Sequence, residues 1–189
     1  GFTAEGEIFY LQDRMGFKNH KFKIFKFATM LKDSLNLGTG SITLTGDFRV
    51  TSMGKYLRST KINELPQLYN ILKGDISIVG PRPVLEQDWL LYPETIRDKI
   101  YDVKPGLTGI GSIVFRDEES IVSKVKDEDP HVYFKRVIAP FKGELEMWYQ
   151  KHRSFSLDLK LIFMTAWVIL VPSSKLYEKW FKDLPKRSF

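Results

Sequence analysis

Two neighbouring stretches, RSTKINELPQ at residues 58–67 and KGDISIVGPRP at residues 73–83, determine most of what this sequence predicts. Apolar residues at helical spacing predict a helix that starts near Glu64, with Pro66 in its first turn, where proline is tolerated. Gly74 ends that helix, because glycine adopts the left-handed conformation found after a last helical turn. The two prolines that follow bias their neighbours away from helix and predict a constrained loop.

These stretches also hold the side chains that could carry out chemistry. Glu64 stands near a helix start, where a carboxylate is favoured and could hold Mg²⁺ together with phosphate oxygens. Arg58 could clamp a phosphate through its planar guanidinium group. Arg82, between two prolines, fits a diphosphate contact as well as it fits a structural turn. The other interpretation is that Glu64 only favours the helix start and that Arg58 is solvated.

Composition limits the classes of protein that are possible. The chain has 189 residues, of which 43% are hydrophobic and 28% charged, as expected for a folded domain. It contains no cysteine, which excludes disulfides and cysteine-ligated metals and favours a reducing compartment. The net charge of +6 favours anionic partners. Nucleic-acid binding has no support beyond this charge, and we expect no nucleic-acid partner.

The rest of the chain predicts an α+β fold, mostly helical, in a single domain over residues 1–189. The β component is expected early, as strands at residues 7–12 and 22–27. Further helices are expected at residues 84–101 and 132–152, with a tight loop at residues 105–109.

The C-terminal segment, residues 159–189, predicts amphipathic helices at a membrane interface. The uncharged run from Leu161 to Val171 stops at Pro172 and is too short to cross a bilayer. Beyond it, apolar residues recur at helical spacing among lysines and an arginine, as in helices that lie in a membrane surface. A helix that packs on the core has the same spacing. The apolar residues are Leu176, Tyr177, Trp180, Phe181 and Leu184.

Five segments, in order along the chain, resemble the bacterial sugar transferases, the monotopic phosphoglycosyl transferases that act on polyprenyl phosphate. The segments are residues 8–16, 25–30, 58–83, 103–109 and 154–160. The resemblance implies transfer of a sugar-1-phosphate from a UDP-sugar to undecaprenyl phosphate, with release of UMP and with Mg²⁺ as cofactor. This reaction starts exopolysaccharide, capsule or O-antigen synthesis. The implied location is the cytoplasmic face of a bacterial inner membrane, with a re-entrant membrane helix before Gly1.

The resemblance also implies roles for individual residues. The family carries an Asp-Glu dyad, in which Asp attacks the β-phosphate to give a covalent phosphosugar enzyme and Glu supports the metal. That dyad falls on Asn63 and Glu64. The catalytic candidates are therefore Asn63, Glu64 and Asp158, the metal ligands Glu64 and Asp158, and the substrate phosphate-binding residues Arg58, Arg82 and Lys26.

Two positions depart from the family pattern. Ala28 stands where the family usually has arginine, and Asn63 replaces the dyad Asp. A carboxamide is a poor nucleophile, so either another carboxylate such as Glu64 replaces it or the acceptor phosphate attacks directly. Alternatively, the chain is a catalytically impaired, membrane-associated homologue that still binds nucleotide sugars. An active variant is favoured because the other site residues are intact.

Overall fold

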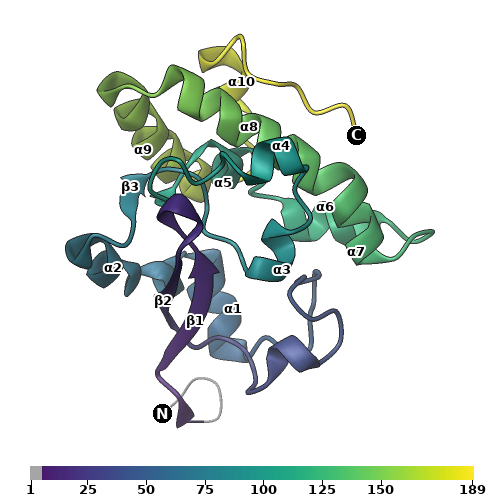
Figure 1. The fold of residues 1–189 in the computed structure, drawn as a ribbon. Coiled ribbons are helices and arrows are strands. Elements are labelled where there is room, and N and C mark those ends of the chain that lie inside the picture. The colour runs from purple at the N-terminus through teal and green to yellow at the C-terminus, as the bar shows by residue number, and fades with distance from the viewer. Residues whose placement is uncertain (1–5) are drawn as a thin grey trace.

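The computed structural model describes residues 6–189, and helices hold more of these residues than strands do (Figure 1), which confirms the α+β class. Two small two-stranded sheets accompany the helices. Figure 1 shows α8 (Ala139–His152), α9 (Phe155–Leu170) and α10 (Leu176–Trp180) gathered at one end of the molecule. The N-terminal hairpin and α1 (Ser52–Ser59) reach toward the other end.

The N-terminal hairpin pairs β1 (Phe9–Met15) with β2 (Lys21–Phe27) in antiparallel register, and the short 3₁₀ helix η2 (Phe17–Asn19) lies between them. Both strands were predicted, and the first extends further than expected. Helix α2 (Gln67–Lys73) docks on β2 through the fully buried Asn70. The Asn70 amide accepts from the Phe25 N–H at 3.0 Å and donates to the Lys23 carbonyl at 2.8 Å.

The second sheet contradicts two expectations. Strand β3 (Ser77–Val79) pairs in parallel with β4 (Gly106–Thr108), so the β component is not confined to the early chain, and the loop predicted at residues 105–109 is largely a strand. The glycines that signalled a loop instead permit close backbone approach. A Cβ atom at position 106 would lie 2.1 Å from the Gly80 nitrogen.

The helix predicted at residues 84–101 is wrong. The segment forms two single-turn helices, α3 (Glu86–Trp89) and α4 (Glu94–Arg97), because Pro93 interrupts the first and precedes the second. The helix expected at residues 132–152 does form, and it begins earlier than predicted. It runs through α7 (Pro130–Tyr133), the π-helical turn η5 (Phe134–Ile138) and α8, whose first turn contains Pro140.

The core lies around α5 (Ile110–Val114), α8 and α9. Helix α9 buries one side, because its buried residues recur at helical spacing. They are Leu157, Leu161, Met164 and Val168. On α8, Leu145 is fully buried and belongs to the same cluster.

The C-terminal apolar residues are mostly core residues, so the interfacial face expected from their spacing is wrong for three of them. Tyr177, Phe181 and Leu184 are buried in the main cluster. Trp180 stays exposed and stacks on Phe163 of α9 at a ring-centroid distance of 5.4 Å. Between residues 6 and 189, no helix is both long and apolar enough to cross a membrane.

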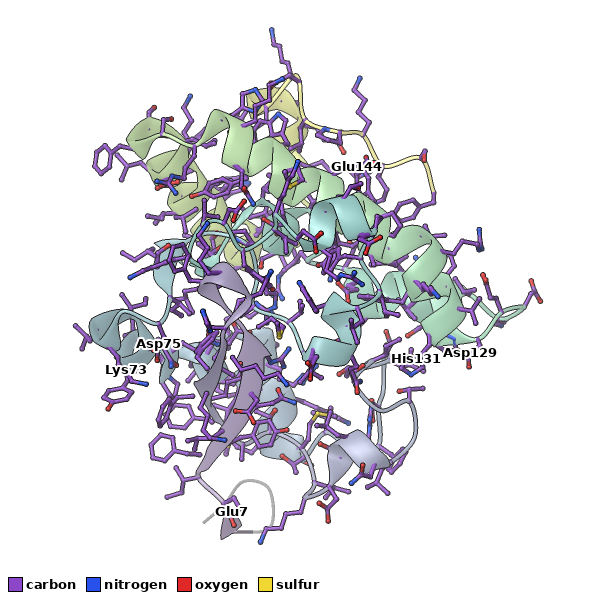
Figure 2. All side chains as sticks on the ribbon, viewed as in Figure 1. Glu7, Lys73, Asp75, Asp129, His131 and Glu144 are labelled. Atoms are coloured by element: carbon purple, nitrogen blue, oxygen red, sulfur yellow. The ribbon has the colours of Figure 1, made fainter. Side chains whose placement is uncertain are left out.

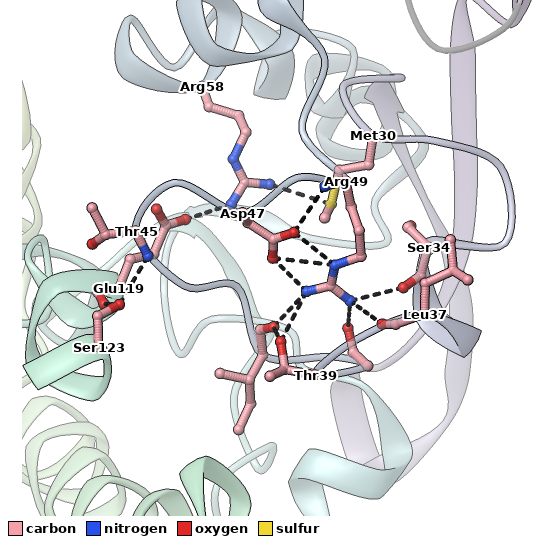
Figure 3. A network of polar contacts seen from close by, with 12 residues as sticks. Met30, Ser34, Leu37, Thr39, Thr45, Asp47, Arg49, Arg58, Glu119 and Ser123 are labelled. Atoms are coloured by element: carbon pink, nitrogen blue, oxygen red, sulfur yellow. Dashed lines mark hydrogen bonds and ion pairs between the residues drawn. The ribbon is translucent and has the colours of Figure 1, made fainter. Parts of the chain in front are cut away.

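A single buried arginine organises the loop at residues 31–50, which contains the short helix η3 (Ser34–Asn36) (Figure 3). Arg49 is 1% exposed and pairs with Asp47 at 2.6 Å. Its guanidinium group also donates to four backbone carbonyls, those of Ser34, Leu37, Gly40 and Ile42.

The loop is fastened to the helical part of the molecule from two sides. The Thr45 N–H donates to the Ser123 hydroxyl of α6 (Glu118–Lys124) at 2.8 Å. The imidazole of His131, beside Asp129 at the start of α7 (Figure 2), lies 3.0 Å from the Thr39 carbonyl oxygen.

Replacing Arg49 with Met should unfold this loop and strongly destabilise the protein. The change leaves Asp47 and four carbonyls without their buried partner, and loss of one member of a buried pair typically costs about 3–5 kcal/mol. Urea denaturation should show a lower midpoint, and limited proteolysis should cut within residues 31–48. Arg136→Met, which removes an exposed ion pair with Glu128, is the matched control and should leave the midpoint unchanged. An unchanged midpoint for Arg49→Met would contradict this role.

Candidate active site

The site centres on an ion pair between two residues singled out by the sequence. Glu64 ends the 3₁₀ helix η4 (Ile62–Glu64), and Arg82 lies in the loop after β3. Arg82 Nη2 donates to Glu64 Oε1 at 2.6 Å. The Glu64 side chain is 11% exposed and the Arg82 side chain 36%, so the arginine is the more accessible partner.

Several backbone contacts hold the Arg82 loop in place. The Gly80 N–H donates to the Thr108 carbonyl, and the Gly106 N–H donates to the Pro81 carbonyl, both at 2.9 Å. The Tyr101 hydroxyl donates to the Arg82 carbonyl at 2.8 Å. The guanidinium group is therefore carried by a loop that the second sheet fixes.

A cavity of about 270 Å³ opens beside the ion pair, and both charged and apolar side chains line it. Its charged side chains are Lys61, Glu64, Arg82 and Arg116. Its apolar wall includes Ile78, Leu107, Ile162, Val168 and Ile169. Hydroxyl groups lie along it as well, and those of Thr108 and Thr165 are hydrogen-bonded at 2.6 Å. The cavity suits a ligand with an anionic head and an apolar tail.

The charges around Glu64 keep its carboxyl group ionised. Burial raises the pKa of Glu64, but Arg82, Lys26 and Lys61 outweigh burial and hold that pKa well below its ordinary range. Glu64 in turn raises the pKa of Arg82. Burial lowers the pKa of Lys26 well below its usual value, although Glu64 opposes the shift. Lys26 therefore interacts electrostatically with Glu64, and it does not line the cavity.

The other predicted site residues lie outside the cavity lining. Asn63 is 7% exposed, and its Oδ1 has no hydrogen-bond partner within the described part of the chain. Arg58 pairs with Glu119 at 2.5 Å (Figure 3). Asp158 accepts a hydrogen bond from the Tyr149 hydroxyl at 2.9 Å. Glu64 and Arg82 are therefore the predicted residues that meet in the cavity.

Sequence reasoning missed two cations that line the cavity. Lys61 precedes η4 with a left-handed backbone, at φ 61°, and stands within the stretch that the sequence had already marked. Arg116 follows α5 and donates to the Ser59 carbonyl at 3.2 Å. Nothing in the local sequence distinguishes Arg116 from a solvated arginine.

The side chains present fit a divalent metal in one limited way. Across residues 6–189, no group of three or more histidine, aspartate or glutamate side chains could hold a metal ion alone. Glu64 is the carboxylate that lines the cavity. Mg²⁺ commonly takes one or two carboxylates and completes its shell with substrate phosphates and water, so Glu64 fits as a single protein ligand.

A buried carboxyl group on α8 contacts the backbone of the Arg82 loop and of α5. Glu146 is 3% exposed, and its Oε1 would lie 2.3 Å from a Cβ atom at position 111. Burial raises the pKa of Glu146 to about 8, opposed by Lys142 and by the backbone N–H groups of Arg82 and Gly111. At neutral pH the group is therefore a neutral acid that connects α8 to the Arg82 loop and to α5.

Comparison with known proteins establishes the class. The family model described as "Bacterial sugar transferase" matches residues 1–172, and the chain belongs to that family. It is 36% identical over 164 residues to the sugar transferase EpsL of Bacillus subtilis, covering 87% of this chain and 70% of EpsL. It is 34% identical over 171 residues to the UDP-glucose:undecaprenyl-phosphate glucose-1-phosphate transferase of Klebsiella pneumoniae.

The undecaprenyl-phosphate glucose phosphotransferase of Komagataeibacter xylinus is 34% identical over 167 residues. The chain spans 33% of the Klebsiella relative and 29% of the Komagataeibacter relative, against 87% and 86% of its own length. The likeness is thus to one region of these two longer proteins.

Glu146→Gln should stabilise the protein increasingly as the pH rises. The folded-state pKa of about 8 lies above the ordinary value of about 4.3, so between these values the folded state binds a proton that the unfolded state lacks. The native protein therefore loses about 1.4 kcal/mol per pH unit across this window relative to the glutamine variant. Urea denaturation of both proteins at several pH values between 5 and 8 would measure the difference. A difference that does not change with pH would contradict the assignment.

Proposed function

We propose that this chain transfers a sugar-1-phosphate from a UDP-sugar to undecaprenyl phosphate and releases UMP, thereby starting exopolysaccharide, capsule or O-antigen synthesis. The supporting observation is a cavity that is lined both by the Glu64–Arg82 ion pair and by apolar side chains. A diphosphate and a polyprenyl phosphate both present phosphate groups to the cationic side chains, and only the polyprenyl chain needs the apolar residues.

In this proposal the chain acts mainly by positioning the phosphates and neutralising their charge. Arg82 stabilises the charge on the transferred phosphate, and Lys26, which does not line the cavity, adds positive charge beside Glu64. An oxygen of the acceptor phosphate forms a bond to the β-phosphorus, and the bond between that phosphorus and the UMP oxygen breaks. Direct attack is favoured over a covalent enzyme intermediate because Asn63 is an amide that does not line the cavity.

In this proposal the remaining predicted residues act on the site without lining the cavity. Asp158 is a positioning residue, because it bonds the Tyr149 hydroxyl, which also approaches the Val79 carbonyl of β3 at 3.5 Å. Arg58 adds positive charge near Lys61 without lining the cavity. Mg²⁺, held by Glu64 and the substrate phosphates, would neutralise further charge on the diphosphate.

The same proposal locates the protein at the cytoplasmic face of a bacterial inner membrane, as a monotopic protein. Helix α9 lines the cavity with Ile162 and Ile169, and it also exposes large apolar side chains. The exposed fractions are 80% for Phe155, 52% for Leu159, 50% for Phe163 and 78% for Leu170. A surface that exposes such residues beside the cavity could rest on lipid and let a polyprenyl chain enter sideways.

The alternative function is a catalytically impaired homologue that binds nucleotide sugars at a membrane. The observation that favours it is Asn63, whose amide is buried at the position of the family's nucleophilic Asp. This reading keeps the binding groups of the cavity and removes the turnover.

Arg82→Met should lower UMP release by about a hundredfold or more, because it removes a charged donor aimed at the reacting phosphate. The assay uses the membrane-reconstituted chain with UDP-sugars, polyprenyl phosphate and Mg²⁺, and Arg136→Met is the control. No UMP release from any donor by the unaltered protein would overturn the transferase proposal. Mg²⁺-dependent UDP-sugar binding without UMP would support the impaired homologue, and Asn63→Asp should then create or greatly raise activity.

Replacing both Leu159 and Phe163 with Ser should weaken binding to lipid vesicles that contain anionic lipid. The reason is the loss of exposed apolar area from the α9 surface. Co-sedimentation with vesicles measures the bound fraction. The matched control is Phe48→Ser, a loop residue that is 70% exposed and lies outside α9, and it should bind as the unaltered protein does. Equal binding by all three proteins would refute the membrane contact through α9.

A further inference from the structure

We propose that Lys61 is a catalytic residue of this site that contacts the β-phosphate of the nucleotide diphosphate beside Arg82. This inference rests on the proposed function and names a ligand for the phosphate that is transferred.

Lys61 lines the cavity and has a backbone conformation that residues other than glycine rarely adopt. Its φ and ψ angles are 61° and 9°, in the left-handed region. Hydrogen bonds on both sides hold the turn, since the Lys61 N–H donates to the Arg58 carbonyl at 3.2 Å and the Glu64 N–H donates to the Lys61 carbonyl at 3.1 Å. A left-handed non-glycine residue persists only where its surroundings enforce it, and such residues concentrate at functional sites.

Among the cations that line the cavity, Lys61 differs because its ammonium group has no hydrogen-bonded partner within residues 6–189. Arg82 pairs with Glu64, Arg58 pairs with Glu119, and Arg116 donates to a backbone carbonyl. Among residues 6–189, Lys61 forms neither a side-chain hydrogen bond nor an ion pair within 4.0 Å. Glu64 offsets part of the charge of Lys61 without forming an ion pair with it, so this ammonium group can receive an anionic ligand.

The charged side chains that line the cavity indicate the charge of the ligand that fits it. Lys61, Arg82 and Arg116 line the cavity against the single carboxylate of Glu64, which leaves an excess of two positive charges. A nucleotide diphosphate ester carries one negative charge on each phosphate and would balance that excess. UMP lacks the β-phosphate and should depend less on Lys61.

Burial supports a role as cation rather than as nucleophile. It lowers the pKa of Lys61 to about 8, with Glu64 opposing the shift and Arg82, Arg116 and Arg58 adding to it. At neutral pH the group is therefore mostly an ammonium ion, and a bound diphosphate would favour that form further. An amine that attacked phosphorus would have to lose this proton first.

Calorimetric titration with UDP and with UMP, at pH 7, tests the assignment. Lys61→Asn removes the charge while asparagine tolerates the left-handed backbone, and Lys61→Arg keeps the charge. We expect Lys61→Asn to weaken UDP binding by about tenfold or more, UMP binding by much less, and Lys61→Arg to change both only slightly. Lys55→Asn, on the exposed side of α1, is the matched control and should behave as the unaltered protein.

The possible failures are distinguishable. Undiminished UDP binding by Lys61→Asn, or equal loss of UDP and UMP binding with an unchanged urea midpoint, would overturn the role of Lys61 and leave the proposed function standing. A phosphohexose adduct on Lys61 after exposure to UDP-sugar, detected by mass spectrometry, would overturn it in favour of a nucleophilic amine. Absence of UDP binding by the unaltered protein would overturn both.

Discussion

The ion pair between Glu64 and Arg82 is the contact on which the site depends. It joins the turn η4 to the loop after β3, two segments that meet through tertiary contacts. Without Arg82, the carboxylate of Glu64, which is 11% exposed, would lose its hydrogen-bonded partner and retain only the charges of Lys26 and Lys61. Because Arg82, Lys26 and Lys61 surround the carboxylate, it remains charged. Its negative charge reduces the repulsion among these cations, which can then face a diphosphate.

The rest of the fold holds that pair in position. Two backbone hydrogen bonds from the second sheet fix the Arg82 loop, and the Tyr101 hydroxyl accepts from the Val84 N–H and donates to the Arg82 carbonyl. Glu146 approaches the loop from α8 as a neutral acid. On the far side, Asn70 attaches α2 to the hairpin. Arg82 thus lies on a loop, but the second sheet and Tyr101 hold that loop in place.

The mixture of charged and apolar side chains around the cavity is consistent with the family to which the chain belongs. One helix, α9, supplies apolar residues both to the cavity and to the exposed surface beside it, so an amphiphilic substrate could bridge the two. Asn63, which the resemblance places at the family's dyad Asp, is buried, does not line the cavity and has an Oδ1 atom without a hydrogen-bond partner within residues 6–189. A site that lost only its nucleophile would retain the capacity to position phosphates, which is why direct transfer and binding without turnover are the alternatives to separate.

The sequence alone determined the two early strands, the end of α2 at Gly74 and the choice of Glu64 and Arg82 as candidate site residues, because each depends on local pattern or on a specific motif. The ion pair between Glu64 and Arg82 was not predicted. Only the tertiary structure decided which apolar residues are buried, because the spacing of apolar residues does not show what covers them. Spacing marked one side of residues 176–184 as apolar, but only packing showed that Tyr177 and its neighbours face the core. Likewise, Arg116 reaches the cavity and the Ser59 carbonyl because segments distant in sequence converge, and local sequence does not indicate which distant segment a side chain will meet.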